Sequence, residues 1–181
     1  MFRGVRVLLN RAGYEFPLSP TVEAIEVLAV TARDFLALSQ PMPALRHICF
    51  IVPILWPSTA VCAHLVSTGV LAQLHSVQIR GEFPPAEILA ELAELRTLVV
   101  DELPRTPVAL PRGLQHVGYQ ASRDELPGAC AVAPLRALPA LRLVTVTRRV
   151  ERQVRAALEG LCWDKGIEFG VYPGPEYVQA R

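Results

Sequence analysis

Four cysteines and four histidines are the side chains of this sequence that could supply thiolate nucleophiles, general bases or metal ligands. The cysteines are widely spaced and form no C-x-x-C pair; they are Cys49, Cys62, Cys130 and Cys162. Each lies in an apolar stretch, so we expect buried, reduced thiols rather than a disulfide framework or a zinc knuckle. The histidines, which are His47, His64, His75 and His116, do not recur at metal-ligand spacing along one helix. No metal site and no cofactor are therefore expected.

Motifs of established enzyme chemistry are missing from the sequence. It contains no G-x-S-x-G, no Walker loop, no G-x-G-x-x-G and no H-E-x-x-H. The acidic pairs Asp101–Glu102 and Asp124–Glu125 lie beside predicted turns, where solvated carboxylates are usual. No catalytic residue is predicted, and the sequence indicates a protein that is not an enzyme.

Composition and charge further limit the kinds of partner and the compartment that we expect for this protein. The 181 residues carry 18 basic and 17 acidic side chains, so no overall field attracts nucleic acid or an anionic membrane. Hydrophobic residues make up 51% of the chain, which excludes general disorder. The uncharged stretch 51–79 is interrupted by Pro53, Pro57 and two histidines, and the N-terminus has too short an apolar run for a signal peptide. We expect an intracellular protein, cytoplasmic or nuclear, that does not bind membranes.

The elements that would position these side chains follow a repeat. Five segments share one pattern that begins at a leucine (position zero); these leucines are Leu45, Leu74, Leu95, Leu114 and Leu141. Apolar residues recur three and five positions later, for example Val77 and Ile79 after Leu74, and three positions earlier. A weaker copy starts near 22, and the copies are separated by about 19 to 29 residues, close to the range of leucine-rich repeats.

Each copy predicts one short strand. Positions plus three and plus five share a face, because side chains alternate along a strand, and a single copy cannot bury that face without stacked neighbours. Helices are predicted between strands at 84–94 and 149–163, with Gly166 ending the second, and less clearly at 31–39 and 58–71. In the repeat that begins at Leu95, prolines predict an extended connection instead. Alternating apolar residues at 167–171 predict a closing strand.

We therefore predict an α/β fold, an irregular leucine-rich-repeat solenoid forming one domain over 1–181. Parallel strands would line the inside of an open arc, with helices and loops outside, repeats starting near 22, 45, 74, 95, 114 and 141, and a closing helix and strand at 149–173. The asparagine that commonly follows the strand in such repeats is missing at every copy, so irregular turns are expected. Short βαβ units of an ordinary α/β sheet are the alternative.

Three segments resemble the irregular leucine-rich regions of fungal F-box proteins: PALRHICFIVP, LPALRLVTVTRRV and, above all, LEGLCWDKGIEFGVYP at 158–173. The resemblance covers about residues 20 to 175, and it implies the substrate-recruiting part of a ubiquitin-ligase adaptor. An F-box would precede the repeats, and none is present in this sequence. The run FPPAEILAEL at 83–92 is similar to an F-box opening but leads directly into a repeat strand. A cullin-adaptor subunit is thus an expected partner only if an upstream F-box exists.

The repeat frame also predicts a surface. Positions plus two, plus four and plus six point to the side of the strands away from the helices, and the nine residues proposed to bind a protein partner there form what we call the inner strip. They are His47, Ser76, Gln78, Arg80, Thr97, Asp101, His116, Gln120 and Thr145. Arg80 and Asp101 are predicted to be neighbours across adjacent strands, whereas His47 and His116 are too far apart to share a proton or a metal.

The sequence leaves three functions open. The first is a protein-interaction module of unidentified partner, recruiting substrates for ubiquitination if its parent carries an F-box. The second is a small α/β enzyme with unrecognised motifs, which a deep polar pocket at the carboxyl ends of the strands would favour. The third is a remnant repeat array without a specific partner.

Overall fold

Eight strands, all parallel, follow one another across a single sheet in the order of the chain. The computed structural model describes residues 6–9, 21–27, 42–54, 59–101, 108–120, 128–147 and 150–172. The strands are β1 (Arg6–Leu9), β2 (Ala24–Val27), β3 (His47–Ile54), β4 (Ser76–Gly81), β5 (Thr97–Val100), β6 (His116–Tyr119), β7 (Leu143–Thr147) and β8 (Glu168–Tyr172). The expected α/β class is confirmed.

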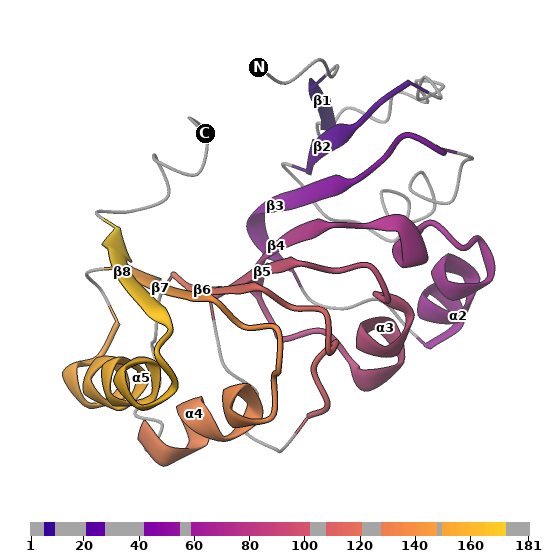
Figure 1. Ribbon diagram of the computed structural model, residues 1–181. Helices are drawn as coiled ribbons and strands as arrows, with labels where there is room; N and C mark the ends of the chain where they lie inside the picture. The colour runs from indigo at the N-terminus through magenta and orange to yellow at the C-terminus, as the bar shows by residue number, and fades with distance from the viewer. Residues whose placement is uncertain are drawn as a thin grey trace.

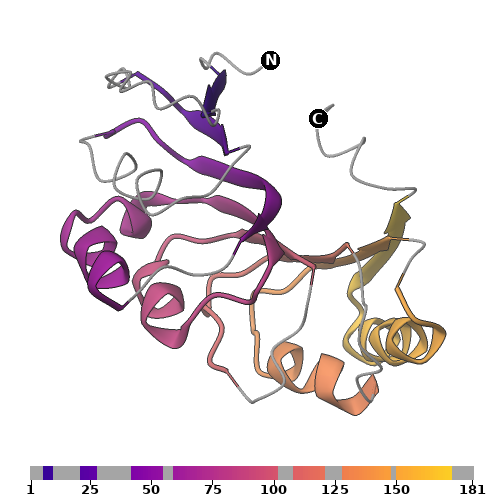
Figure 2. The same cartoon turned by 180° about the vertical axis from the view of Figure 1, so that it is seen from behind.

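The described helices lie on one side of this sheet (Figures 1 and 2). They are α2 (Thr59–Ser67), the single 3₁₀ turn η1 (Leu71–Gln73), α3 (Ala86–Glu91), α4 (Gly128–Arg136) and α5 (Arg152–Lys165). The strands follow a curve with the helices on its outer side (Figure 1), which leaves the opposite side of the sheet, here called the inner face, free of described helices.

Strand register is the one that the repeat frame predicts. The plus-two residues pair in one row from β2 to β7, as Ser76 with Thr97 and Thr97 with His116, and the plus-three residues form the next row. The leucines at position zero are buried between sheet and helices together with the plus-three and plus-five side chains, in one hydrophobic core. Burying each such side chain contributes about 1.5 to 3 kcal/mol.

A repeated backbone pattern holds the strand entries in this register. The carbonyl oxygen of Arg46 accepts hydrogen bonds from the N–H groups of both His75 and Ser76, at 2.8 and 3.1 Å. The carbonyls of Glu23, His75, Arg96 and Gln115 receive the same pair of bonds from the next repeat. Main-chain groups therefore form a ladder at the strand entries, and these entries are regular although the outer connections differ.

The outer connections match the predictions unevenly. Segment 84–94 contains α3, 149–163 contains most of α5, and Gly166 ends α5 with a positive φ of 65°, as its lack of a side chain permits. Segment 58–71 forms α2 and the start of η1, and 31–39 lies outside the described residues. In the proline-containing connection, the described residues 108–111 carry no helix. The sequence missed α4 and β1.

Candidate functional site

The inner strip lies on the face of the sheet away from the helices. Its plus-two members are half-buried neighbours in register, His47, Ser76, Thr97 and His116 on β3 to β6. The next row is more enclosed than a solvated face would be: Gln78 and Thr145 are 8% and 5% exposed. Since parallel strands lie about 4.8 Å apart and this face is the inside of the curve, side chains crowd each other there.

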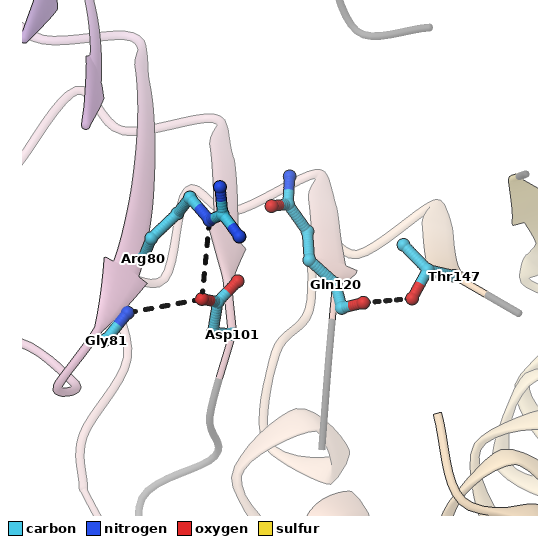
Figure 3. A network of polar contacts seen from close by, with 5 residues as sticks. All are labelled: Arg80, Gly81, Asp101, Gln120 and Thr147. Atoms are coloured by element: carbon cyan, nitrogen blue, oxygen red, sulfur yellow. Dashed lines mark hydrogen bonds and ion pairs between the residues drawn. The ribbon is translucent and has the colours of Figure 1, made fainter. Parts of the chain in front are cut away.

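Arg80 and Asp101 form the cross-strand pair that the sequence predicts. The guanidinium Nε of Arg80 lies 3.6 Å from Oδ2 of Asp101, and the same oxygen accepts a hydrogen bond from the backbone N–H of Gly81 at 3.3 Å (Figure 3). Gly81 has a φ of 89°, so the chain turns there in a conformation that favours glycine. Asp101 thus fastens the end of β4 to the end of β5.

The other carboxylate oxygen of Asp101, Oδ1, differs from Oδ2 in its hydrogen bonding. Oδ1 is buried and accepts no hydrogen bond from the part of the chain that the structure describes. A buried acceptor without a donor costs about 1 to 3 kcal/mol, and native proteins leave few of them. The described residues therefore leave the hydrogen-bonding capacity of this oxygen unused.

The plus-six row, which contains Arg80 and Asp101, continues past β5 with Gln120 and Thr147. Thr147 Oγ1 donates a hydrogen bond to the backbone carbonyl of Gln120, and the amide of Gln120 extends to the same side of the sheet as the Arg80 guanidinium (Figure 3). Gln120 is 8% exposed. The side-chain amides of Gln120 and Gln78 make no hydrogen bond to another described residue, so each retains a donor and an acceptor.

One expected neighbour in the plus-six row is wrong. The frame places Ile51 beside Arg80, but β3 is irregular between Cys49 and Pro53, and Pro53 pairs with Arg80 instead. Proline lacks the N–H that a regular ladder needs, so a break in register at this strand is understandable. The inner strip is therefore regular from β4 to β7.

His116 and Thr145 make a diagonal contact across β6 and β7. His116 Nε2 lies 2.8 Å from Thr145 Oγ1. The intervening residue is Gly118, and a Cβ atom built there would lie only 2.9 Å from the same hydroxyl and 3.1 Å from Val99 Cγ2. Glycine at 118 therefore makes room for this contact, a role that the repeat pattern does not reveal.

Burial lowers the pKa of His116. The pKa of His47 is also lowered, first by burial and then by His75 and Arg46, against an opposing effect of Glu23. Both imidazoles are therefore neutral near pH 7, and they can accept as well as donate hydrogen bonds. They lie on β3 and β6 with two strands between them, so they do not act as a pair.

The lowered pKa of His116 predicts a loss of stability in acid. The unfolded chain keeps an ordinary histidine pKa of about 6.5 and binds more protons than the folded one just below that pH, so the free energy of unfolding falls until the folded pKa is passed. We expect His116→Gln to reduce this fall. Urea unfolding at about pH 7.5 and about pH 5.5 measures it. His64→Gln, at an exposed position of α2, is the control, and an equal effect of the two would contradict the prediction.

The cysteines outside the inner strip agree in part with the expectation of buried thiols. Cys62 and Cys162 are buried thiols, and burial, followed by a nearby glutamate, raises the pKa of each. Cys49 is only half-buried, because it occupies the plus-four row of the inner face rather than the core. The side chain of Cys130 lies outside the described residues.

Metal sites and membrane-spanning helices are absent from the described residues, and the cavity beside α2 and α3 is part of the core. No three of the described His, Cys, Asp or Glu side chains gather to hold a metal ion. A cavity between the sheet and α2 and α3 has only apolar lining, including Phe50, Leu65 and Ile88, and belongs to the core. Among the described helices none is long and apolar enough to cross a membrane.

Comparison with known proteins gives no relative. No family model, no curated protein and no solved structure matches the chain. The fold, the inner strip and its hydrogen-bonding groups are therefore the observations on which function is argued.

Proposed function

We propose that the chain is an irregular leucine-rich-repeat array that binds a protein partner along its inner strip, as the substrate-recruiting part of an F-box ubiquitin-ligase adaptor. The strand order, the common register and the one-sided helices support the repeat array. The ubiquitin-ligase role is supported by the sequence resemblance alone.

The observation that carries the binding role is unused hydrogen-bonding capacity on the inner face. Asp101 Oδ1 is buried without a described donor, and the enclosed side chains of Gln78 and Gln120 lie on the same face, on β4 and directly after β6. A polypeptide brings alternating N–H and C=O groups, and its N–H groups or basic side chains can reach Asp101 while its carbonyls accept from the glutamines. A protein segment laid along the inner face can offer hydrogen-bonding groups to all three side chains.

The test needs variants that block the strip without disturbing its framework. Asp101 is unsuitable because it holds Arg80 and Gly81 in place. Ser76 and Thr97 are half-buried neighbours in the plus-two row and take part in no hydrogen bond of their side chains to described residues. The double variant Ser76→Arg/Thr97→Arg therefore fills the strip with two long cations. Its matched control is Ala90→Arg/Ala133→Arg, which adds the same charge at exposed positions of α3 and α4 on the outer side.

We expect partner binding to fall at least about tenfold in the strip variant and to stay unchanged in the outer control. Proteins captured from the native cell by the natural chain are identified, and binding of the purified candidate is then measured by calorimetry. A partner that binds the strip variant as tightly as the natural chain rejects the inner strip as its site. Recovery of a cullin-adaptor subunit with the full native protein tests the ligase role separately, and its failure leaves the binding result intact.

A further inference from the structure

The C-terminal end of the sheet is open and exposes apolar side chains. β8 pairs with β7, and no described strand pairs with its other edge. The two exposed large hydrophobic side chains of the described residues lie here, Trp163 at 88% and Val171 at 37%. Between α5 and β8 a groove is lined by one carboxylate and otherwise by small or apolar residues: Ala156, Glu159, Gly160, Cys162, Trp163, Ile167 and Phe169. The last element of a repeat array needs a polar outer face to remain alone in water, and here Trp163 and Val171 interrupt an otherwise polar exposed surface.

The free edge of β8 is complementary to itself. Glu168 N–H bonds to Arg142 O on the side of β7, so the N–H and C=O groups of the alternate residues, Phe169 and Val171, point away from the sheet. A twofold axis through Gly170 places Phe169 opposite Val171 of a second, antiparallel copy. Each such pair can exchange two hydrogen bonds, and Gly170 meets its own copy at the closely spaced, non-hydrogen-bonded position.

The same axis also relates α5 to its copy. Ideal geometry gives a rise of about 10 Å from Ile167 to Gly170 along the strand and about 10 Å from Lys165 back to Leu158 along the helix, which puts Gly170 and Leu158 at about one level in an antiparallel helix–strand pair. Reversal about Leu158 brings Arg152 opposite Asp164 of the other copy, and both side chains are exposed. Opposite charges thus meet at both ends of the helix pair.

Trp163 fits between these helices. The exposed stripe of α5 is formed by Ala156, Gly160 and Trp163, and the two small residues line the groove. In the reversed register, Trp163 of one copy faces Gln153 and Ala156 of the other. The indole therefore enters the groove of the second copy, where it loses its exposure to water, and large aromatic side chains in such pockets dominate binding energies.

We propose that two copies of this chain associate through β8 and α5 about a twofold axis at Gly170, which joins their sheets edge to edge. This interface is distinct from the inner strip and goes beyond the proposed function. Because the axis is perpendicular to the sheet, the inner faces of both copies point to the same side. A partner with two binding segments is then held by both strips, with the gain in affinity that linked sites provide.

Analytical ultracentrifugation of the natural chain between about 1 µM and about 100 µM measures the association. We expect a monomer–dimer equilibrium that Trp163→Arg and Val171→Pro each weaken at least about tenfold; proline at 171 removes an outward N–H without touching the bonds to β7. Arg152→Asp is expected to weaken the dimer and Arg152→Asp/Asp164→Arg to restore it. Ala133→Arg on α4 is the control and should dimerise normally.

Three outcomes decide the proposal. Concentration-dependent dimers that the edge variants weaken and the charge exchange restores support it. A natural chain that stays monomeric throughout the range overturns it and leaves this end to another partner. Dimers that Trp163→Arg does not weaken, while circular dichroism shows the variant folded, also overturn it, because association then uses a different surface.

Discussion

Leu114→Ala is expected to lower the free energy of unfolding by about 2 to 5 kcal/mol, the range for removing a fully buried leucine side chain without collapse of the space around it. Leu114 is 0% exposed and occupies position zero of its repeat, between the leucines of the preceding and following repeats. The neighbours on either side are held by parallel pairing with β5 and β7 and cannot close the gap. The midpoint of urea unfolding at unchanged slope measures the loss.

Leu143→Ala is the matched control for this prediction. The substitution is chemically identical, but Leu143 is half-buried in the plus-two row of the inner face. We expect a loss of about 1 kcal/mol or less, since fewer atoms leave an apolar environment. Equal losses at 114 and 143 would contradict the prediction, because the repeat frame requires the position-zero leucine to be buried in the core and the plus-two leucine to lie on the inner face.

The regular part of the fold was predictable because it rests on two local rules. Side chains alternate along a strand, and one short strand cannot bury its apolar face alone. These rules give the rows that contain Val77 and Ile79, and they also give the neighbours Arg80 and Asp101. None of this needs knowledge of the connections, which is why irregular outer segments did not disturb the register.

The missed elements lack the signal on which those rules depend. For β1 the position-zero residue is Gly4, so the leading leucine is missing although Val7 pairs with Ile25 in the plus-three row. For α4 the sequence contains Pro134 inside the helix, and proline normally argues against one. In both cases neighbouring repeats supply the pairing or packing that the local sequence does not indicate.

Which residues form the inner strip was easier to predict than how buried they are and which of their polar atoms are hydrogen-bonded. Alternation places Gln78 and Thr145 on the inner face, but it does not say that curvature brings neighbouring rows close enough to bury them. Nor does it distinguish the two oxygens of Asp101, of which Oδ2 is bonded and Oδ1 is not. Unused hydrogen-bonding groups become visible only when every neighbour is placed, and they are the basis of the binding proposal.

Gly118→Val is expected to destabilise the fold by about 3 kcal/mol, at the upper end of the cost of overpacking. A Cβ at 118 would lie 2.9 Å from Thr145 Oγ1 and 3.1 and 3.2 Å from the two methyl carbons of Val99. Both neighbours are buried on strands fixed by pairing, so they can move only by changing rotamer. Displacing Thr145 also breaks its contact with His116. Urea unfolding measures the loss.

Two comparisons separate crowding from a general intolerance of side chains at glycine. At Gly113 the nearest atom to an added Cβ would be the carbonyl oxygen of Leu95, at 3.5 Å, so Gly113→Ala should change stability by no more than about 0.5 kcal/mol. Adding Val99→Gly to Gly118→Val removes the methyl contacts but keeps the hydroxyl contact, and the two substitutions should couple favourably by about 1 kcal/mol. If the two losses of stability simply add, the side chain of Val99 does not restrict the space at position 118. The low exposure of the inner-face side chains would then need a cause other than crowding between β5 and β6.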